Sequence, residues 1–98
     1  MLQQLMENGS TFNLVADQNE DLNQLELEIK QWIAQAVLYA ESEFSKSKLL
    51  EDLYAAKGDF SKVDKEKVKT VFGIILAFEE AQKIRSANAQ AIWDLNKN

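Results

Sequence analysis

Apolar residues recur through the first half of the chain at the spacing of an α-helix. From Leu22 they follow one another at intervals of three and four residues: Leu22, Leu25, Ile29, Trp32, Ala36 and Tyr39. Four more apolar residues widen this stripe: Leu27, Ile33, Val37 and Leu38. A stripe of this width is typical of an amphipathic helix that faces a protein core. The pattern therefore predicts a core-facing helix, with the indole of Trp32 inside the core.

The stripe is interrupted between residues 41 and 48, where three serines stand among alternating charges. Apolar residues resume at Leu49. Ser45 or Ser47 could cap a second, short helix that ends at Ala56, because a serine at the N-cap accepts a hydrogen bond from the backbone of the first turn. One bent helix through this region is the alternative.

The last third of the chain predicts one long helix over residues 61–97. Between Val71 and Phe78 its apolar residues cover every face, which indicates burial by neighbours on several sides. From Ala81 onward the pattern narrows to intervals of three and four, the spacing of a coiled-coil seam. The seam consists of Ala81, Ile84, Asn88, Ala91 and Leu95. Asn88 stands where a polar residue would fix the register of a coiled coil.

Three glycines and no proline punctuate the chain. We expect Gly9 to end a short first segment and Gly58 to end the second helical stretch, because glycine favours the left-handed position after a helix. Gly73 differs, since it lies inside an apolar run and indicates close approach by a neighbouring helix.

Two capping signals predict where helices begin. Asp17 and Ser61 are each followed three residues later by an acidic side chain, Glu20 and Asp64. This arrangement is the capping box of a helix N-terminus. Residues 10–16 fit either a loop or extra turns of the helix that begins near Asp17.

These patterns predict an all-α protein that forms a single helical domain over residues 1–98. Its parts are a short N-terminal segment (1–16), a long and a short helix (17–57) and a long final helix (61–97). Helices joined by short loops in this order form an up-and-down bundle or a long helical hairpin.

The length of the final helix raises the question of what covers its end. A helix over residues 62–96 is about 50 Å long, whereas a compact chain of this size has a diameter of about 35 Å. Either the helix breaks near Ser86–Asn88, or its last turns project and pack against a second copy or another partner. We favour projection and a homodimer, because the last turns carry apolar residues unsuited to a solvated tail: Ile84, Ile92, Trp93 and Leu95.

The composition excludes several kinds of chemistry. The chain has no cysteine and no histidine, so it can form no disulfide, zinc-finger site, thiolate nucleophile or imidazole base. Ser45 and Lys48 have the Ser-x-x-Lys spacing of penicillin-recognising enzymes, without the Ser-Asp-Asn and Lys-Thr-Gly motifs of that class. We therefore expect no catalytic activity, small-molecule substrate, cofactor or metal.

Charge is distributed unevenly along the chain. Residues 1–44 carry eight acids and one base, and residues 45–98 carry eight acids and ten bases. The asymmetry favours docking between the two halves or with a partner, and it disfavours contact between the first half and nucleic acid.

A cluster of lysines supports the alternative function, association with nucleic acid. Its members are Lys57, Lys62, Lys65, Lys67 and Lys69, with Phe60 beside them. Interleaved acids at Asp59, Asp64 and Glu66 reduce the net charge of residues 57–69 to +2. A solvated helix start is the simpler interpretation, so contact with nucleic acid is the less favoured function.

The sequence as a whole indicates a small acidic protein that acts by protein–protein binding, as an adaptor, chaperone, immunity or inhibitor-like accessory protein. The expected partner-binding residues lie on the final helix: Ile84, Asn88, Ala91, Ile92, Trp93 and Leu95. The apolar run of residues 71–78 is too short to span a bilayer, so no membrane insertion is expected. The absence of a signal-peptide pattern and of cysteine favours a cytoplasmic location.

Overall fold

The computed structural model describes the backbone of residues 1–18, 22–58 and 63–97, and the side chains of these ranges up to Arg85. Within them the chain forms four α-helices that pack together: α1 (Leu2–Gln18), α2 (Glu26–Glu43), α3 (Lys48–Lys57) and α4 (Lys65–Lys97). A 3-10 turn, η1 (Asn23–Leu25), precedes α2. The prediction of an all-α protein is confirmed.

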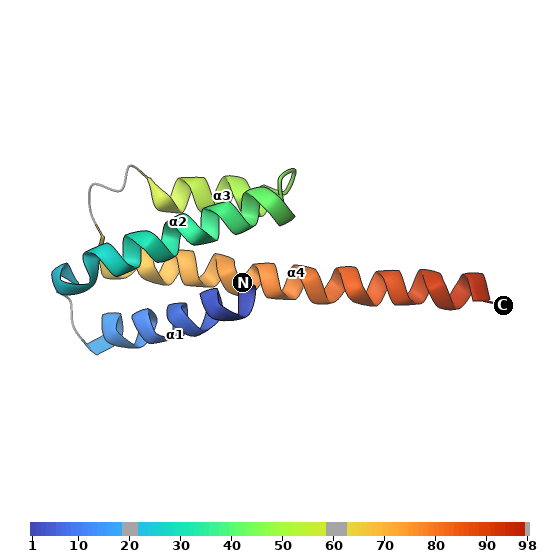
Figure 1. Cartoon of the computed structure of the whole chain (residues 1–98), viewed down its shortest axis with the longest axis horizontal. Helices are drawn as coiled ribbons and strands as arrows, with labels where there is room; N and C mark the ends of the chain where they lie inside the picture. Colours follow the sequence, from blue (N-terminus) through green and yellow to red (C-terminus); the bar gives the residue numbers. More distant parts are fainter. Residues whose placement is uncertain (19–21, 59–62, 98) are drawn as a thin grey trace.

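Consecutive helices run in opposite directions, and α4 continues past the ends of the other three (Figure 1). The molecule is therefore elongated, with dimensions of 58 × 24 × 18 Å. Because α4 is one continuous helix from Lys65 to Lys97, it does not break near Ser86.

The first helix is longer than the sequence pattern predicted. Instead of a short segment that ends at Gly9, α1 continues to Gln18. The reason is a second apolar stripe, in which Leu5, Phe12 and Ala16 follow one another at helical spacing and pack into the core. As a result Asp17 lies at the end of α1 rather than at the start of the next helix, and α2 begins at Glu26.

Gly9 lies at a close contact between helices rather than at a helix end. A methyl group on Gly9 would lie 2.5 Å from Cδ1 of Phe72 in α4 and 2.8 Å from Cζ2 of Trp32 in α2. The missing side chain lets α1 approach both helices. Trp32 is buried, as predicted, and its indole N–H donates a hydrogen bond of 2.9 Å to the carbonyl oxygen of Leu5.

The predicted corner between the second and third helices is present as two separate helices. Helix α2 ends at Glu43, and Ser47 caps α3 by accepting a hydrogen bond of 3.0 Å from the backbone N–H of Leu49. Gly58 ends α3 with a φ of 61°, which confirms the predicted helix end.

The start of α4 differs slightly from the capping-box prediction. Asp64 was expected inside the first turn, but its carboxylate accepts a hydrogen bond of 2.8 Å from the backbone N–H of Lys67, so Asp64 is the capping residue and the helix begins at Lys65. The proposed cap Ser61 lies outside the described residues.

Helix α4 is the element on which the core is built, since its contacts with α1 and with α3 are the most extensive between the helices. Up to Arg85, four of its side chains have no exposed surface: Val68, Val71, Ile75 and Phe78. Burial of a side chain of this size stabilises a fold by about 1.5–3 kcal/mol. The first half of α4 is therefore fixed in place by the packing of α1, α2 and α3.

Candidate functional site

The outer face of α4, opposite its buried side chains, has no neighbouring helix among the described residues. We define this outer face by Gly73, Leu76, Ala77, Glu80 and Ile84. Ile84 is 59% exposed and Leu76 is 39% exposed, and a methyl group on Gly73 would meet no atom within 4 Å. As predicted, several neighbours bury this part of α4, since α1, α2 and α3 all contact it, but they leave the outer face exposed.

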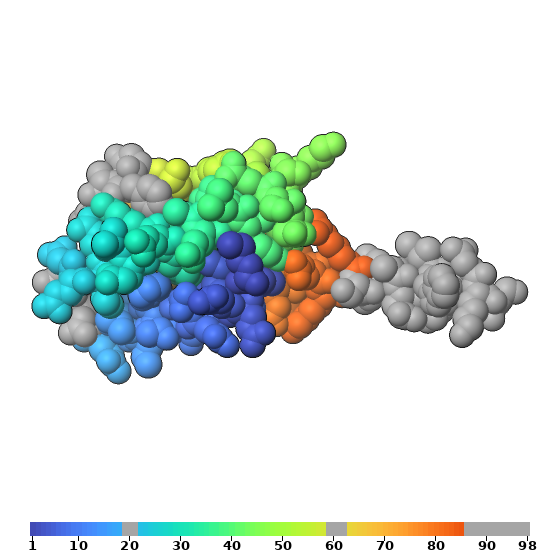
Figure 2. Space-filling model, viewed as in Figure 1, coloured from blue at the N-terminus to red at the C-terminus, as the bar shows by residue number. Residues whose placement is uncertain are grey.

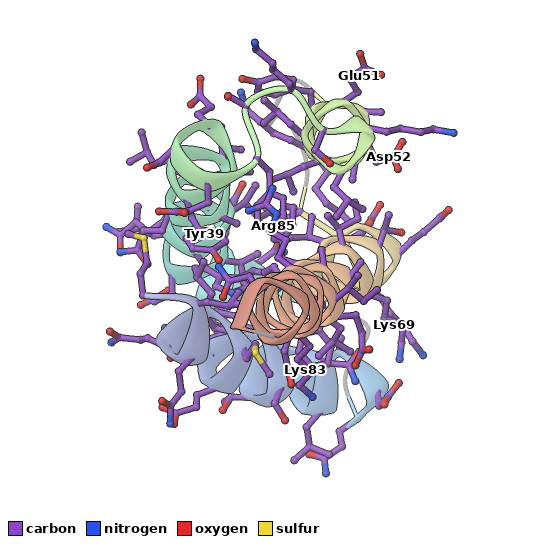
Figure 3. The ribbon with its side chains drawn as sticks, turned by 90° about the vertical axis from the view of Figure 1, so that its right-hand side faces the viewer. Tyr39, Glu51, Asp52, Lys69, Lys83 and Arg85 are labelled. Carbon is purple, nitrogen blue, oxygen red and sulfur yellow. The ribbon has the colours of Figure 1, made fainter. Side chains whose placement is uncertain are left out.

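The point at which α4 leaves the bundle is held by polar contacts to α2 and to the turn after it. Gln82 donates a hydrogen bond to the hydroxyl of Tyr39. Arg85 donates one of 3.2 Å to the carbonyl oxygen of Glu43, and its guanidinium lies 4.3 Å from the ring centroid of Phe44. Figure 3 shows Arg85 pointing toward α2 and α3, on the same side of α4 as Tyr39.

Aromatic contacts also hold α4 where it leaves the bundle. The rings of Phe44 and Phe78 are stacked with centroids 4.8 Å apart, and the ring of Tyr39 lies 5.8 Å from that of Phe78. Burial raises the pKa of Tyr39, and the nearby carboxylate of Glu43 raises it further. The direction in which α4 continues is consequently fixed by both apolar and polar contacts.

On the face of the molecule that Figure 2 shows, the described end of α4 extends past the N-terminal end of α1. The described end of α4 lies between the turn that joins α2 to α3 and the N-terminal end of α1. Beyond it α4 continues as a helix whose side chains are outside the description.

A group of charges flanks the outer face. The ammonium group of Lys83 lies 2.8 Å from a carboxylate oxygen of Glu79 and 3.8 Å from one of Glu80. The hydrogen bond that Lys83 donates to Glu79 raises the pKa of Lys83, and the charges of both glutamates act in the same direction. In Figure 3 Lys83 points away from Arg85, so the two cations lie on different sides of α4.

Of the predicted partner-binding residues, Ile84 is the one whose side chain the structure describes. Its exposure agrees with the predicted role without testing it. The other five lie beyond the described side chains: Asn88, Ala91, Ile92, Trp93 and Leu95.

Helix α2 also presents exposed apolar residues that the sequence pattern assigned to the core. Leu27 is 66% exposed and Leu38 is 62% exposed. Both lie on the side of α2 opposite the buried Ile29 and Ala36. Leu27 and Leu38 are eleven residues apart, which is three helical turns, so they share one face of α2. This face lies away from the core stripe, and the spacing is the signal that separates the two residues from the buried ones.

The lysine cluster around the start of α4 is partly engaged by α1. Lys69 donates a hydrogen bond of 3.3 Å to the side-chain oxygen of Asn13 and forms an ion pair with Asp17. The hydrogen bond from Lys69 lowers the pKa of Asp17, and the positive charges of Lys69 and Lys65 lower it further. This pairing reduces the positive charge that the cluster presents; Lys62 lies outside the described residues.

A shallow hollow lies on the outside of the α2–α3 turn. Its lining residues are Glu43, Phe44, Ser45, Lys46, Ser47 and Arg85. Four of them already have structural roles: Ser47 caps α3, Arg85 is bound to the carbonyl oxygen of Glu43, and Phe44 stacks on Phe78. Across residues 1–18, 22–58 and 63–85, no three acidic side chains gather to hold a metal ion.

No helix within the described part of the chain is long and apolar enough to cross a bilayer. The chain matches no model of a protein family, and neither the characterised proteins nor the solved structures contain a match to it.

Proposed function

We propose that this protein acts by binding other polypeptide chains through the outer face of α4, and that its first partner is a second copy of itself. In this proposal it is a small accessory protein of the adaptor, chaperone, immunity or inhibitor type, and it performs no catalysis. The surface involved is the outer face defined above, together with the continuation of α4 beyond the bundle.

The observation that carries the proposal is the exposure of Ile84 on a helix whose position is fixed. Single exposed apolar side chains are common on protein surfaces. Ile84, however, lies next to Gln82 and Arg85, which hold α4 to the bundle, so a partner would meet it in a preorganised position. Preorganisation lowers the entropic cost of binding.

The sequence continues the same face beyond Arg85. Positions 77, 84 and 91 are separated by seven residues, and positions 81, 88 and 95 repeat the interval. In a continuous helix such positions form one seam, the pattern by which helices of separate chains pair. A helix with this seam is suited to bind another helix, and an identical helix supplies the matching seam.

The test is the dissociation constant of the homodimer, measured by sedimentation equilibrium for the intact chain and two variants. Ile84→Glu places a charge on the outer face of α4, and Leu38→Glu places the same charge on α2 at nearly equal exposure (59% and 62%). We expect Ile84→Glu to weaken the dimer at least tenfold, which corresponds to about 1.4 kcal/mol, and Leu38→Glu to leave it unchanged.

Two results would contradict the proposal. One is a wild-type chain that stays monomeric into the high micromolar range. The other is a dimer that Leu38→Glu weakens as much as Ile84→Glu does. Circular dichroism of both variants checks that each remains folded.

A further inference from the structure

A groove runs between α1 and α2, the two helices that lie side by side on the face shown in Figure 2. Its volume is about 260 Å³. Sites that hold a whole small molecule typically have volumes of about 300–1,000 Å³, so this groove is better suited to a single side chain of a partner. Residues from both helices line it: Asn8, Phe12, Glu28, Gln31, Trp32 and Gln35. None of them belongs to α4, so the groove is separate from the outer face of α4.

The groove contains two aromatic rings, those of Phe12 and Trp32, whose centroids lie 5.4 Å apart. Trp32 is buried, and its N–H is bound to the carbonyl oxygen of Leu5, so the indole is fixed. Phe12 is only half-buried, so part of its ring is accessible from the groove. A cation within about 6 Å of such a ring is attracted to its face. The chain itself contains this contact at Phe44, where the guanidinium of Arg85 lies 4.3 Å from the ring centroid.

Four side chains in the groove carry oxygen atoms that accept hydrogen bonds: Asn8, Glu28, Gln31 and Gln35. Within the described part of the chain, no hydrogen bond or ion pair involves these carboxylate and amide groups. A guanidinium group matches them, because it presents five N–H donors in one plane and its flat face also stacks on an aromatic ring. An ammonium group is a compact charge that does not stack in this way.

The surface around the groove is acidic. Together α1 and α2 carry six acidic side chains: Glu7, Asp17, Glu26, Glu28, Glu41 and Glu43. Their one basic side chain, Lys30, is paired with Glu26 at 3.0 Å. A surface with this balance attracts cations and repels anions. The groove therefore suits a positively charged occupant.

Exposed leucines continue the α2 wall of the groove. Gln31 lies four residues after Leu27 and seven residues before Leu38, so the three share one face of α2. Leu27 and Leu38 are both exposed. A free small cation would leave this apolar surface uncovered, whereas a polypeptide covers it with the residues on either side of its basic side chain. These leucines therefore favour a segment of protein as the occupant.

We propose that the groove between α1 and α2 binds an arginine side chain from a basic segment of a partner protein. The guanidinium group stacks on the accessible part of the Phe12 ring. It donates hydrogen bonds to the carboxylate of Glu28 and to the side-chain oxygens of Gln31 and Gln35. Apolar residues beside the arginine pack on the exposed leucines of α2. This surface goes beyond the proposed function, since it is a second binding site that contains no residue of α4.

The test is a titration of the full-length chain with two short peptides, followed by NMR. One peptide alternates arginine and leucine, and the other has lysine in place of each arginine. We expect the arginine peptide to bind roughly fivefold more tightly, because only the guanidinium both stacks and donates from one plane. Binding should shift the side-chain amide signals of Asn8, Gln31 and Gln35, and leave that of Gln82 on α4 in place.

Two variants with the same change of charge locate the contact. Glu28→Gln removes a carboxylate from the groove, and Asp52→Asn removes one from α3, which Figure 3 shows on the opposite side of the molecule from α1. Both carboxylates are exposed, so neither substitution disturbs the core. We expect Glu28→Gln to weaken binding of the arginine peptide roughly tenfold, because a charge-assisted hydrogen bond is lost. Asp52→Asn should weaken it by less than about twofold, because solvent and salt screen an exposed charge on the far side.

The proposal is overturned if the arginine peptide does not bind, or binds no more tightly than the lysine peptide, since attraction by net charge would then account for the result. Equal weakening by Glu28→Gln and Asp52→Asn would place the contact outside the groove. Unchanged amide signals of Gln31 and Gln35 would do the same. The mass of the chain in solution tests the proposed homodimer separately, so the failure of either proposal leaves the other standing.

Discussion

The two faces of α4 show how differently one helix can be used on its two sides. On the inner face Val71, Ile75 and Phe78 have no exposed surface, whereas on the outer face Leu76 and Ile84 are 39% and 59% exposed. Both faces carry large apolar residues, although the outer face also includes the charged Glu80, so the presence of apolar residues does not by itself decide which face is buried. What decides it is that α1, α2 and α3 all pack on one side, and the apolar residues on the other side remain available for a partner.

The two helical glycines repeat this contrast on a smaller scale. Gly9 is buried against the rings of Phe72 and Trp32, and Gly73 faces open space. The same residue type in the same kind of backbone thus lies in a close contact between helices at one position and in an open position at the other.

The largest difference in the free energy of unfolding is expected between alanine variants of two neighbouring residues, one on each face of α4. Ile75→Ala removes a fully buried side chain and should lower the free energy of unfolding by about 2–5 kcal/mol. Leu76→Ala removes a partly exposed one and should cost less than about 1 kcal/mol, because alanine also favours the helix. Urea unfolding followed by circular dichroism measures both. Equal losses would show that the two faces are not distinguished by burial.

Alanine substitutions at the two glycines should change stability by smaller amounts, and the two changes should have opposite signs. Gly9→Ala forces a methyl group into the contact with Phe72 and Trp32, and overpacking of this kind costs about 1–3 kcal/mol, partly offset by helix propensity. Gly73→Ala gains helix propensity with no clash and should stabilise the chain by up to about 1 kcal/mol. Thermal unfolding in dilute solution, where the chain is monomeric, provides the comparison. Stabilisation by both substitutions would contradict the tight packing at Gly9.

The smallest effect is expected where α1 meets the start of α4, at the ion pair between Asp17 and Lys69. Lys69 lowers the pKa of Asp17 below its ordinary value of 3.8. The ion pair therefore stabilises the fold above pH 3.8, and this contribution is lost as the pH falls through the folded-state pKa. Asp17→Asn should lower the unfolding temperature slightly at neutral pH, and the difference from wild type should vanish in acid. A difference that persists unchanged at pH 2 would exclude this ionisation as its cause.

The sequence predicted the helices well where apolar spacing and caps agreed. The burial of Trp32 and the helix end at Gly58 followed from residue type and position alone. The cap of α3 was limited to Ser45 or Ser47, and the structure places it at Ser47. Gly9 was misinterpreted because a glycine that ends a helix and a glycine that admits a neighbouring ring look alike in a sequence. Only the positions of Phe72 and Trp32 in space separate the two cases.

The candidate surface was harder to predict in detail. Leu27 and Leu38 widen the apolar stripe of α2 in the sequence, yet both are exposed, because the neighbouring helices cover a narrower arc than the stripe. Spacing identified Ile84 as part of a seam. It could not show that the exposed face of α4 extends back to Gly73, since this depends on which side of α4 the other helices occupy.

The most direct test of the central claim is the mass of the intact chain in solution by sedimentation equilibrium. A protein that pairs through the outer face of α4 should approach twice the chain mass of 11.2 kDa as its concentration rises through the micromolar range. A mass that stays at 11.2 kDa throughout would contradict the account, because the exposed face around Ile84 would then have no partner in a second copy.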